Sequence, residues 1–289
     1  MQTADWSRAP IGIAGGGRVG QAIGRILRES GEPVTCVACR TVERGRSAAE
    51  FIGGTVRPVS FKDLPAHASR ILVAVPDEAL ESVAGALDLD GGIVLHTCGS
   101  RGPDALDVLR ARGVFCGTLH PLQTIPEPAA GVAALRGAAF AISGDDEAAD
   151  WAARIAGLAG GEVLRIDPGS SALYHAAAVM ASNYVTALLG AAESLLEAVG
   201  VEAPRARRAL APLVRASVEN ALRLGPVEAL TGPIQRGDAA TVAAHVSALS
   251  AVREPIPALY RAAGLEALEL AAQRGLSAGR ESAIRQILR

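Results

Sequence analysis

Short apolar runs bounded by turn residues recur through the first half of the chain. Their near-continuous hydrophobicity is typical of parallel strands that are buried on both faces. Amphipathic stretches lie between them and predict crossover helices, so the alternation predicts an α/β fold with a doubly wound, mostly parallel sheet. The predicted strands cover residues 11–14, 34–39, 71–75, 93–95, 114–116, 138–142 and 163–166, and the predicted helices cover residues 21–27, 42–52, 77–87, 103–112 and 147–159.

The pattern changes after residue 167, where the strands stop. Residues 170–198 form one Ala- and Leu-rich helical stretch that is longer than any crossover helix before it. The sequence therefore predicts a sheet domain over residues 1–167 and an all-helical domain over residues 168–289. Small side chains fill these helices and aromatic residues make up only 3% of the chain, which favours close helix packing and a homodimer formed through the helical domain. Further helices are predicted at residues 204–224, 239–249, 255–273 and 277–288.

A glycine-rich turn lies between the first predicted strand and the first predicted helix. Gly15, Gly17 and Gly20 have the spacing of the dinucleotide-binding turn of a Rossmann domain, where they provide a tight turn, a close approach to pyrophosphate and close helix packing. The amides that open the helix, including those of Arg18 and Val19, and its dipole favour phosphate. The turn predicts a nucleotide site, and the alternative is a glycine-rich turn without a ligand.

The end of the second predicted strand indicates which nucleotide binds. An acidic residue there would hold the ribose hydroxyls of NAD, but the strand ends in Arg40 and Thr41, and Arg44 and Arg46 follow. The guanidinium fork of Arg40 fits a 2′-phosphate, and Thr41 can donate a hydrogen bond to it. These residues predict NADP(H) as the cofactor of the sheet domain. The alternative is a solvated arginine at a strand end.

Composition and charge narrow the classes of function. The net charge of −2 and the pI near 6.2 come without a basic face or arm, so we expect no nucleic-acid partner. Residues 1–10 lack an apolar segment, and no apolar run approaches the roughly 18 residues of a membrane span. We therefore expect a cytoplasmic protein that binds a small-molecule substrate and no membrane.

The four cysteines lie in or at the ends of predicted strands and do not indicate disulfides. Cys36 and Cys39 form a CxxC pair, but a strand places positions i and i+3 on opposite faces. No second cysteine pair or nearby histidine completes a ligand set, so we expect no metal site.

Three strand ends are candidate walls of a ligand site, because ligands of open parallel sheets bind at the carboxyl ends of the strands. Val75 and Pro76 end one predicted strand, His96 and Thr97 end the next, and His120 follows the one after that. We expect all three ends to face the nicotinamide.

Two further polar residues at these ends have simpler interpretations. The hydroxyl of Ser100, like that of Thr97, can hydrogen-bond a ribose or phosphate oxygen. Asp77 is interpreted as the N-cap of the helix that follows it rather than as a site residue.

The long helix predicted over residues 170–198 carries a polar stripe. His175, Ser182 and Asn183 lie on roughly one face of it. A helix that crosses the nicotinamide cleft could use His175, or His120 of the sheet domain, to donate or accept a proton, while Asn183 orients the reacting carbonyl or imine and Ser182 contacts the substrate. The alternative is a histidine and an asparagine whose hydrogen bonds are satisfied within an interface.

A second polar segment, residues 230–238, is predicted to turn between two helices. Thr231 and Arg236 could hold a substrate carboxylate, and Asp238 is well placed to cap the next helix. The alternative is a turn held by an ion pair between Arg236 and Asp238. His245, in the middle of that next helix, is expected to face the same cleft.

These motifs, in this order, resemble one known family. Over nearly its whole length the chain resembles the Rossmann-like NADP-dependent oxidoreductases that carry a C-terminal helical domain of unknown function. More distantly it is similar to the ketopantoate, pyrroline-5-carboxylate and β-hydroxyacid reductases of the 6-phosphogluconate dehydrogenase superfamily. The resemblance implies hydride transfer to a C=O or C=N bond, with the second domain closing over the cofactor and completing a dimer. The motifs are the glycine turn, Val75-Pro76-Asp77, His96-Thr97, His120-Pro121-Leu122, Tyr174-His175 with Asn183, and Leu230-Thr231-Gly232-Pro233 with Arg236-Gly237-Asp238.

One departure from these relatives affects the chemistry. Ketopantoate and hydroxyacid reductases use a lysine at the start of the second-domain helix, whereas the only lysine of this chain is Lys62. We therefore infer an acid/base role for His175 or His120. Two functions stay open: an NADP(H)-dependent oxidoreductase of a small, carboxylated ketone, hydroxyacid or imine, and an NADP(H)-binding sensor that turns nothing over.

Overall fold

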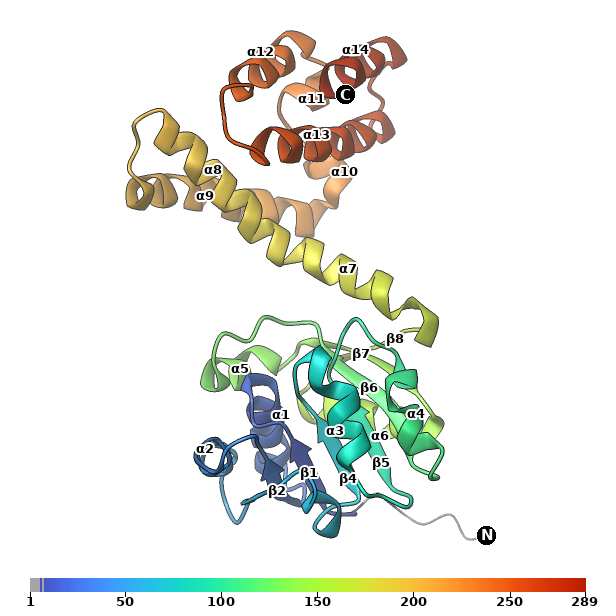
Figure 1. Cartoon of the computed structure of the whole chain (residues 1–289). Coiled ribbons are helices and arrows are strands. Elements are labelled where there is room, and N and C mark those ends of the chain that lie inside the picture. The colour runs from blue at the N-terminus through green and yellow to red at the C-terminus, as the bar shows by residue number, and fades with distance from the viewer. Residues whose placement is uncertain (1–5, 7) are drawn as a thin grey trace. The chain divides into compact units, whose positions relative to one another are not determined.

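The structure is a computed structural model that describes residue 6 and residues 8–289. The chain forms two compact units, Met1–Ser182 and Asn183–Arg289. The first unit contains an eight-stranded sheet in the order β3-β2-β1-β4-β5-β6-β7-β8 (Figure 1). Its strands are β1 (Ile11–Ala14), β2 (Val34–Ala38), β3 (Arg57–Val59), β4 (Arg70–Val73), β5 (Ile93–His96), β6 (Phe115–Pro121), β7 (Ala139–Gly144) and β8 (Glu162–Arg165).

The sheet has the doubly wound, mostly parallel topology that the sequence predicts. Strands β1 to β6 pair in parallel, and β1 lies between β2 and β4, so the strand order reverses beside β1. β7 is antiparallel to β6, and β8 is parallel to β7. Ligands of such sheets bind at the carboxyl ends of the strands beside the reversal, which fixes where a site is expected.

Helices cover both faces of the sheet. Leu72 of β4 lies in a core with residues of α1, α2 and α6, whereas Ile71 lies in a second core with residues of α3 and α4. Cys36 belongs to the second core and Cys39 packs against the first, so the prediction that they lie on opposite faces is confirmed. The helices of this unit are α1 (Arg18–Glu29), α2 (Val42–Ile52), α3 (Leu80–Ala86), α4 (Asp107–Arg110), α5 (Pro128–Leu135), α6 (Asp146–Leu158) and α7 (Ser171–Ala181), with 3₁₀ turns η1 (Leu64–Ala66), η2 (Asp77–Ala79), η3 (Pro103–Leu106) and η4 (Pro168–Ser170).

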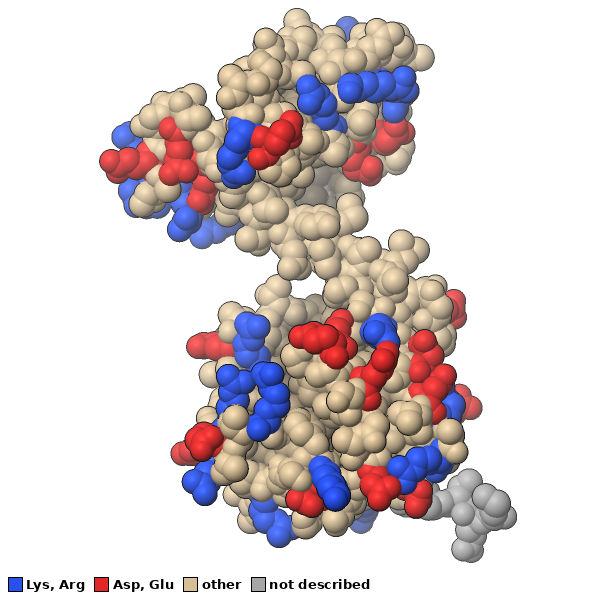
Figure 2. Space-filling model, viewed as in Figure 1, with Lys and Arg blue, Asp and Glu red and all other residues tan. Residues whose placement is uncertain are grey.

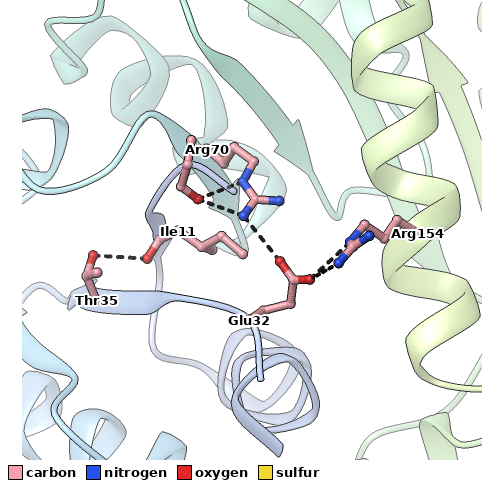
Figure 3. Close-up of polar contacts among 6 residues, drawn as sticks. Ile11, Glu32, Thr35, Arg70 and Arg154 are labelled. Atoms are coloured by element: carbon pink, nitrogen blue, oxygen red, sulfur yellow. Dashed lines mark hydrogen bonds and ion pairs between the residues drawn. The ribbon is translucent and has the colours of Figure 1, made fainter. Parts of the chain in front are cut away.

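A buried ionic network ties the amino ends of the strands together (Figure 3). The carboxylate of Glu32, only 5% exposed, accepts hydrogen bonds from Arg70 at 3.2 Å and from Arg154 of α6 at 2.5 and 3.0 Å. Arg70, 1% exposed, also donates to the carbonyl of Ala9 and lies 5.5 Å from the ring centroid of Trp151. Charged groups buried this deeply are stable only when they are paired, and Glu32 and Arg70 are paired with each other.

Three elements of the first unit differ from the sequence prediction. β3 was not predicted, because a short edge strand with exposed Arg57 and Pro58 has no apolar run. Helix α5 was missed because its alanines and glycine give no apolar stripe. β6 continues to Pro121, so His120 lies inside the strand, and the prediction that it follows the strand was wrong.

The second unit is entirely helical, as predicted. Its core contains Val242, Leu268, Ile284 and Leu288 from α12, α13 and α14. Asp238 caps α12 by accepting a hydrogen bond from the amide of Thr241 at 3.0 Å, which confirms the predicted cap. The helices are α8 (Asn183–Ala198), α9 (Ala203–Leu224), α10 (Pro226–Ala229), α11 (Pro233–Arg236), α12 (Ala239–Leu249), α13 (Ile256–Gln273) and α14 (Ala278–Leu288).

The long helix predicted over residues 170–198 is interrupted. Ser182, with φ −125° and ψ −67°, separates α7 from α8, and the boundary between the two units falls directly after it. The helical run Pro168–Ala198 contains an 18-residue window with a mean hydropathy of 1.2, so by length and composition alone it could cross a membrane. The expectation that no run reaches this length was therefore wrong, although core helices of water-soluble proteins pass the same test.

Candidate functional site

The glycine turn between β1 and α1 has the local geometry that close approach of a pyrophosphate requires. Gly15 has a φ of +109°, and a Cβ there would collide with the backbone of Ala74. A Cβ on Gly20 would collide with the carbonyl oxygen of Gly15. Around Gly17, in contrast, no atom beyond its two chain neighbours lies within 4 Å of the Cβ position, so the turn is open on this side. The three glycines thus provide a turn, a close packing contact and an open surface.

The first turn of α1 is free to receive an anion. Its N-cap is Gly17, which has no side chain to bond the helix amides, and the turn contains no acidic residue. The amides of Arg18 and Val19 therefore lie at the positive end of the helix with no capping side chain. The Arg18 guanidinium, which is exposed, donates to the carbonyl of Pro126 at 3.3 Å.

Arginines gather beside the carboxyl end of β2. Arg40 and Arg44 are exposed, and within the described residues Arg40 has no ion pair or hydrogen bond through its guanidinium. Thr41 is the N-cap of α2 and accepts a hydrogen bond from the amide of Arg44 at 3.3 Å, which leaves its own O–H free to donate. Figure 2 shows Lys and Arg side chains grouped over the part of the first unit where α1 and α2 lie.

His120 projects beyond the end of the neighbouring strand. The last residue of β5, His96, pairs with Thr118, so β6 continues past β5 and carries His120 over the segment that follows β5. Nδ1 of His120 lies 2.7 Å from the hydroxyl of Tyr174, and the two rings meet edge to face at 5.5 Å. Tyr174 comes from α7, which belongs to the same unit.

His175 also packs against the His120 ring. The centroids of the two imidazoles are 5.7 Å apart at an angle of 79°. Both rings lie against Gly99: a Cβ there would be 2.6 Å from Cδ2 of His175 and 2.7 Å from Nε2 of His120. Only a glycine lets the backbone approach both imidazoles this closely. The structure thus brings together His120, His175 and Tyr174, which we call the histidine cluster.

The histidine cluster is electrostatically unusual. Burial, together with the neighbouring His175, lowers the pKa of His120 to about 4, so this imidazole is neutral at physiological pH. Burial raises the pKa of Tyr174 to about 12, which keeps its hydroxyl protonated. Neither ring nitrogen of His175 has a hydrogen-bond partner among the described residues, and His175 is only half-buried. Strongly perturbed groups next to an open imidazole are typical of functional sites.

His96 does not face the site, contrary to the prediction. It is fully buried, Nδ1 accepts a hydrogen bond from the amide of Cys98, and Nε2 donates to the carbonyl of Gly102 at 2.9 Å. Because Nδ1 must accept, burial and this contact hold the ring neutral, and burial lowers the pKa of His96. Its role is to shape the segment of residues 97–102 that presents Gly99 to the histidine cluster.

Asp77 is not a helix cap, contrary to the prediction. It lies inside η2, whose N-cap is Pro76, and its carboxylate instead accepts a hydrogen bond from the hydroxyl of Ser100 at 2.9 Å. Partial burial acts to raise the pKa of Asp77, but hydrogen bonds from Cys98 and Ser100 and the nearby His175 outweigh it and lower that pKa. A carboxylate therefore stands beside the histidine cluster.

The other predicted site residues divide between the two units. Val75, Pro76 and Thr97 follow β4 and β5 at the same edge of the sheet as the histidine cluster. Ser182, at the end of α7, donates to the carbonyl of Ala178 at 3.1 Å. Asn183, Thr231, Arg236 and His245 belong to the second unit, where His245 is exposed and bonds Tyr260.

Tyr174 of the histidine cluster and Gly99, which lies against both imidazoles, had no role assigned from the sequence. Tyr174 was noted only as the neighbour of His175, because consecutive helix residues point in different directions. Gly99 gave no signal in a chain with 32 glycines. The contact between strand and helix that joins them cannot be read from local sequence.

The cysteines are not candidates for nucleophilic chemistry. All four are free, and burial raises the pKa of each thiol, to about 12 for Cys116. Within the part of the chain that the structure describes, no group of three or more His, Cys, Asp or Glu residues is arranged to hold a metal ion.

Comparison with known proteins identifies the parts of the chain. Residues 2–121 match the family model of Rossmann-like domains, and residues 138–267 match DUF2520, a domain of unknown function. The Rossmann-like match thus comes first along the chain and the DUF2520 match follows it. The predicted resemblance is thereby confirmed. The DUF2520 match begins beside β7, so it includes the last strands of the sheet as well as α7 and most of the helical unit.

Solved structures share this fold along nearly the whole chain. Protein TM1727 from Thermotoga maritima is 22% identical with a TM-score of 0.75, and the alignment covers 91% of this chain and 99% of that one. BF3122 from Bacteroides fragilis, provisionally named an NADP oxidoreductase, is 22% identical with a TM-score of 0.72 and coverages of 92% and 100%. Pyrroline carboxylate reductase from Plasmodium falciparum, solved with NADP bound, is 14% identical with a TM-score of 0.58 and coverages of 96% and 98%. No curated protein matches the chain.

Proposed function

We propose that this protein is an NADP(H)-dependent oxidoreductase that transfers a hydride to or from the C=O or C=N bond of a small, carboxylated substrate. One observation carries the proposal. The start of α1, which no side chain caps, follows β1, and His120 of the histidine cluster lies near the end of β6, so both lie at the carboxyl edge of one sheet, where open sheets bind ligands. The first feature suits a dinucleotide and the second suits proton transfer.

The turn around Gly17 fits the pyrophosphate of the cofactor. A phosphate needs open space, free amides and no competing carboxylate, and all three occur at the start of α1. At the end of β2, the unpaired Arg40 and the free O–H of Thr41 suit a 2′-phosphate, which favours NADP(H) over NAD(H). The residues that we assign to the cofactor are Gly15, Gly17, Arg18, Val19, Gly20, Arg40, Thr41, Val75, Pro76 and Thr97.

Proton transfer is assigned to the histidine cluster. When bound, the cofactor supplies or accepts the hydride, so the chain must move one proton to or from the substrate oxygen or nitrogen. Lys62 is the only lysine of the chain, and it does not lie at the start of the second-domain helix, where the related reductases carry theirs. We therefore assign this step to other residues. His120 near the end of β6 and His175 of α7 have ring nitrogens that no described residue bonds, and they are the acid/base candidates.

The substrate side of the proposal rests on residues of the last part of α7 and of the second unit. Ser182, Thr231 and Arg236 are assigned to the substrate, with Arg236 for a carboxylate, and Asn183 to orientation of the reacting bond. Relatives of the same fold support a C=N or C=O substrate, since they include pyrroline carboxylate reductases and an imine reductase from Streptomyces aurantiacus.

A homodimer through the helical unit is part of the proposal. Large apolar side chains of this unit are exposed, among them Tyr184 and Leu188 of α8 and Leu213 and Leu222 of α9. Exposed apolar side chains at helical spacing favour a helix partner. Light scattering of the purified protein should give the mass of a dimer, and a monomer would remove this part of the proposal.

The test of the proposal is a pair of titrations of the full-length protein with NADPH and NADH, followed by nicotinamide fluorescence and then by turnover of ketones and imines. We expect NADPH-selective binding, and Gly17→Ala should weaken it at least about tenfold because a methyl group fills the open surface. The control is Gly157→Ala in α6, where the Cβ position is also empty. Binding without turnover of any substrate would favour the sensor, and no binding would refute both.

A further inference from the structure

The contact between Tyr174 and His120 admits two arrangements of hydrogen. At 2.7 Å, either Tyr174 donates its O–H to Nδ1 of His120, or an Nδ1–H donates to the phenol oxygen. The two arrangements leave His120 with opposite properties at Nε2. In the first Nε2 carries the hydrogen and is a donor, and in the second it is an acceptor.

The chemistry of the two groups favours the first arrangement. The bare nitrogen of a neutral imidazole is a much stronger acceptor than a phenol oxygen, and a phenol O–H is a better donor than an imidazole N–H. Burial raises the pKa of Tyr174 to about 12, so its proton is retained. Burial and His175 lower the pKa of His120 to about 4, so that ring has one bare nitrogen to accept it.

We propose that Tyr174 is a positioning residue that holds His120 in its neutral Nε2–H tautomer, so that His120 donates a hydrogen bond to the reacting oxygen or nitrogen of the substrate while His175 exchanges the proton. The two imidazoles then have separate tasks. This inference rests on the proposed function for its substrate, but the tautomer itself is a property of the protein alone.

The geometry around the two rings supports the division of tasks. Nδ1 of His120 is committed to Tyr174, whereas Nε2 has no hydrogen-bond partner among the described residues and lies against the Cβ-free face of Gly99. His175 has no internal partner at either nitrogen within the described chain, so it can gain or lose a proton without breaking a contact. The His120 ring, whose Nδ1 is already hydrogen-bonded, suits a fixed donor, and the His175 ring, which has no internal hydrogen bond among the described residues, suits proton exchange.

The charges that face the histidine cluster are consistent with this assignment. His120 interacts electrostatically with His175, Asp77 and His96, and among the described residues no carboxylate hydrogen-bonds either of its nitrogens. His96 is itself neutral and faces Asp77, Asp104 and Arg101. Asp77 interacts electrostatically with both His120 and His175, and it favours a positive charge there.

The proton balance of a reduction follows from these assignments. Hydride adds to the substrate carbon, and the electron pair of the C=O or C=N bond moves onto oxygen or nitrogen. Protonated His175 gives its proton to that atom and becomes neutral, and it regains a proton from water. His120 keeps its Nε2–H throughout and stabilises the charge that develops on the same atom.

A second histidine–tyrosine pair in the same chain provides a matched control. In the helical unit, Nδ1 of His245 lies 2.9 Å from the hydroxyl of Tyr260, with ring centroids 5.9 Å apart at 85°. This pair has nearly the geometry of the first but no second imidazole beside it, and His245 is exposed. Tyr260→Phe therefore removes the same kind of contact without touching the histidine cluster.

The experiment is nitrogen NMR of the full-length protein with ¹⁵N-labelled histidine, at neutral pH and without cofactor. Imidazole nitrogen shifts distinguish the two neutral tautomers, and His120→Gln assigns the signals. We expect His120 to be a single Nε2–H tautomer in the wild type. We expect Tyr174→Phe to release a measurable Nδ1–H fraction, and Tyr260→Phe to leave the His120 signals unchanged. An Nδ1–H tautomer or a mixture in the wild type would overturn the proposal even if the variant did not fold.

Steady-state kinetics test the second part of the proposal, that His120 assists the reaction as a hydrogen-bond donor. With a substrate in hand, Tyr174→Phe should lower kcat about tenfold with little change in KM, because a donor to the developing charge acts mainly in the transition state. Tyr260→Phe should change neither constant. The expected tautomer with an unchanged kcat would show that Tyr174 fixes the ring but that His120 does not assist the reaction. Absence of NADPH binding would refute the proposed function and leave the tautomer result standing.

Discussion

The two edges of the sheet use buried polar residues in opposite ways. At the amino edge, Glu32 and Arg70 are buried and every charge is paired inside the protein, with Arg154 completing the network. At the carboxyl edge, His120 and His175 are partly buried and keep ring nitrogens that no described residue bonds. A saturated network can only hold the fold together, whereas an open one can also bind and react.

The comparison makes a general point about polar residues in a core. Burial alone does not indicate function, because Arg70 is among the most buried side chains of the chain and its partners are all internal. The informative observation is a perturbed group with an unused donor or acceptor. In the first unit the histidine cluster meets this condition and the Glu32 network does not.

The largest expected effect comes from removing the carboxylate of the buried ionic network at the amino edge of the sheet. Glu32→Ala leaves Arg70 buried without its carboxylate, so the free energy of unfolding should fall by about 3–5 kcal/mol in denaturant titrations. The control is Glu29→Ala, whose exposed pairs with Arg25 and Arg136 are worth less than about 1 kcal/mol. The NADPH affinity of folded Glu32→Ala should be unchanged. Equal losses in the two variants would mean that the buried network does not stabilise the fold.

The next largest effect is expected at the carboxyl edge of the sheet, where a substitution should lower turnover and leave the stability of the fold nearly unchanged. His175→Ala should lower turnover by about 100-fold or more because it removes the proton-exchanging group, while the free energy of unfolding changes by less than about 1 kcal/mol. His67→Ala, which removes a histidine between η1 and β4 that the proposal does not use, should leave turnover unchanged. Unaltered turnover in His175→Ala would reduce its role to packing.

A charge reversal at the end of β2 tests the cofactor assignment at the same edge. Arg40→Asp should weaken NADPH roughly tenfold or more and weaken NADH much less, because only NADPH carries the 2′-phosphate. Arg165→Asp is the control, since this arginine is also exposed at the end of a strand but lies in β8. Equal loss of both nucleotides in Arg40→Asp would remove the assignment.

The smallest effect is a pH dependence of stability that separates the two edges. The pKa of His120 is lowered in the folded protein to about 4, so the unfolded chain binds this proton first as the pH falls. The stabilisation is present above pH 6.5 and is lost between about pH 6.5 and 4. Discounted for solvent screening, it amounts to about 1–2 kcal/mol. In thermal melts His120→Gln should lose less stability than the wild type over this window, and parallel curves would contradict the assignment.

Much of the first unit could be predicted from sequence, because apolar runs and glycine spacing are local signals. β1, the start of α1 and the bend at Gly15 to Gly20 follow from patterns that span a few residues. The buried pair of Glu32 and Arg70 could not, since these residues are 38 positions apart and a charge gives no sign of burial in its own sequence.

The site was predicted in part for the same reason. His120 and His175 stood out as residue types, but their contact joins a strand to a helix and depends on how far β6 runs. Asp77 was misread because a carboxylate before a helix is usually a cap, and here the hydroxyl of Ser100 is a tertiary partner for it. At His120 and Asp77, which lie close to the proposed chemistry, tertiary contacts determine the structure and local sequence preferences do not.

The most direct test of the account is a titration of ¹⁵N-histidine-labelled protein with NADPH, in which every histidine is followed at once. We expect saturable shifts of the His120 and His175 signals, a smaller or absent shift at buried His96, and much weaker binding of NADH. Saturable NADPH binding that leaves both His120 and His175 unmoved would contradict the claim that the histidine cluster faces the reacting end of the cofactor.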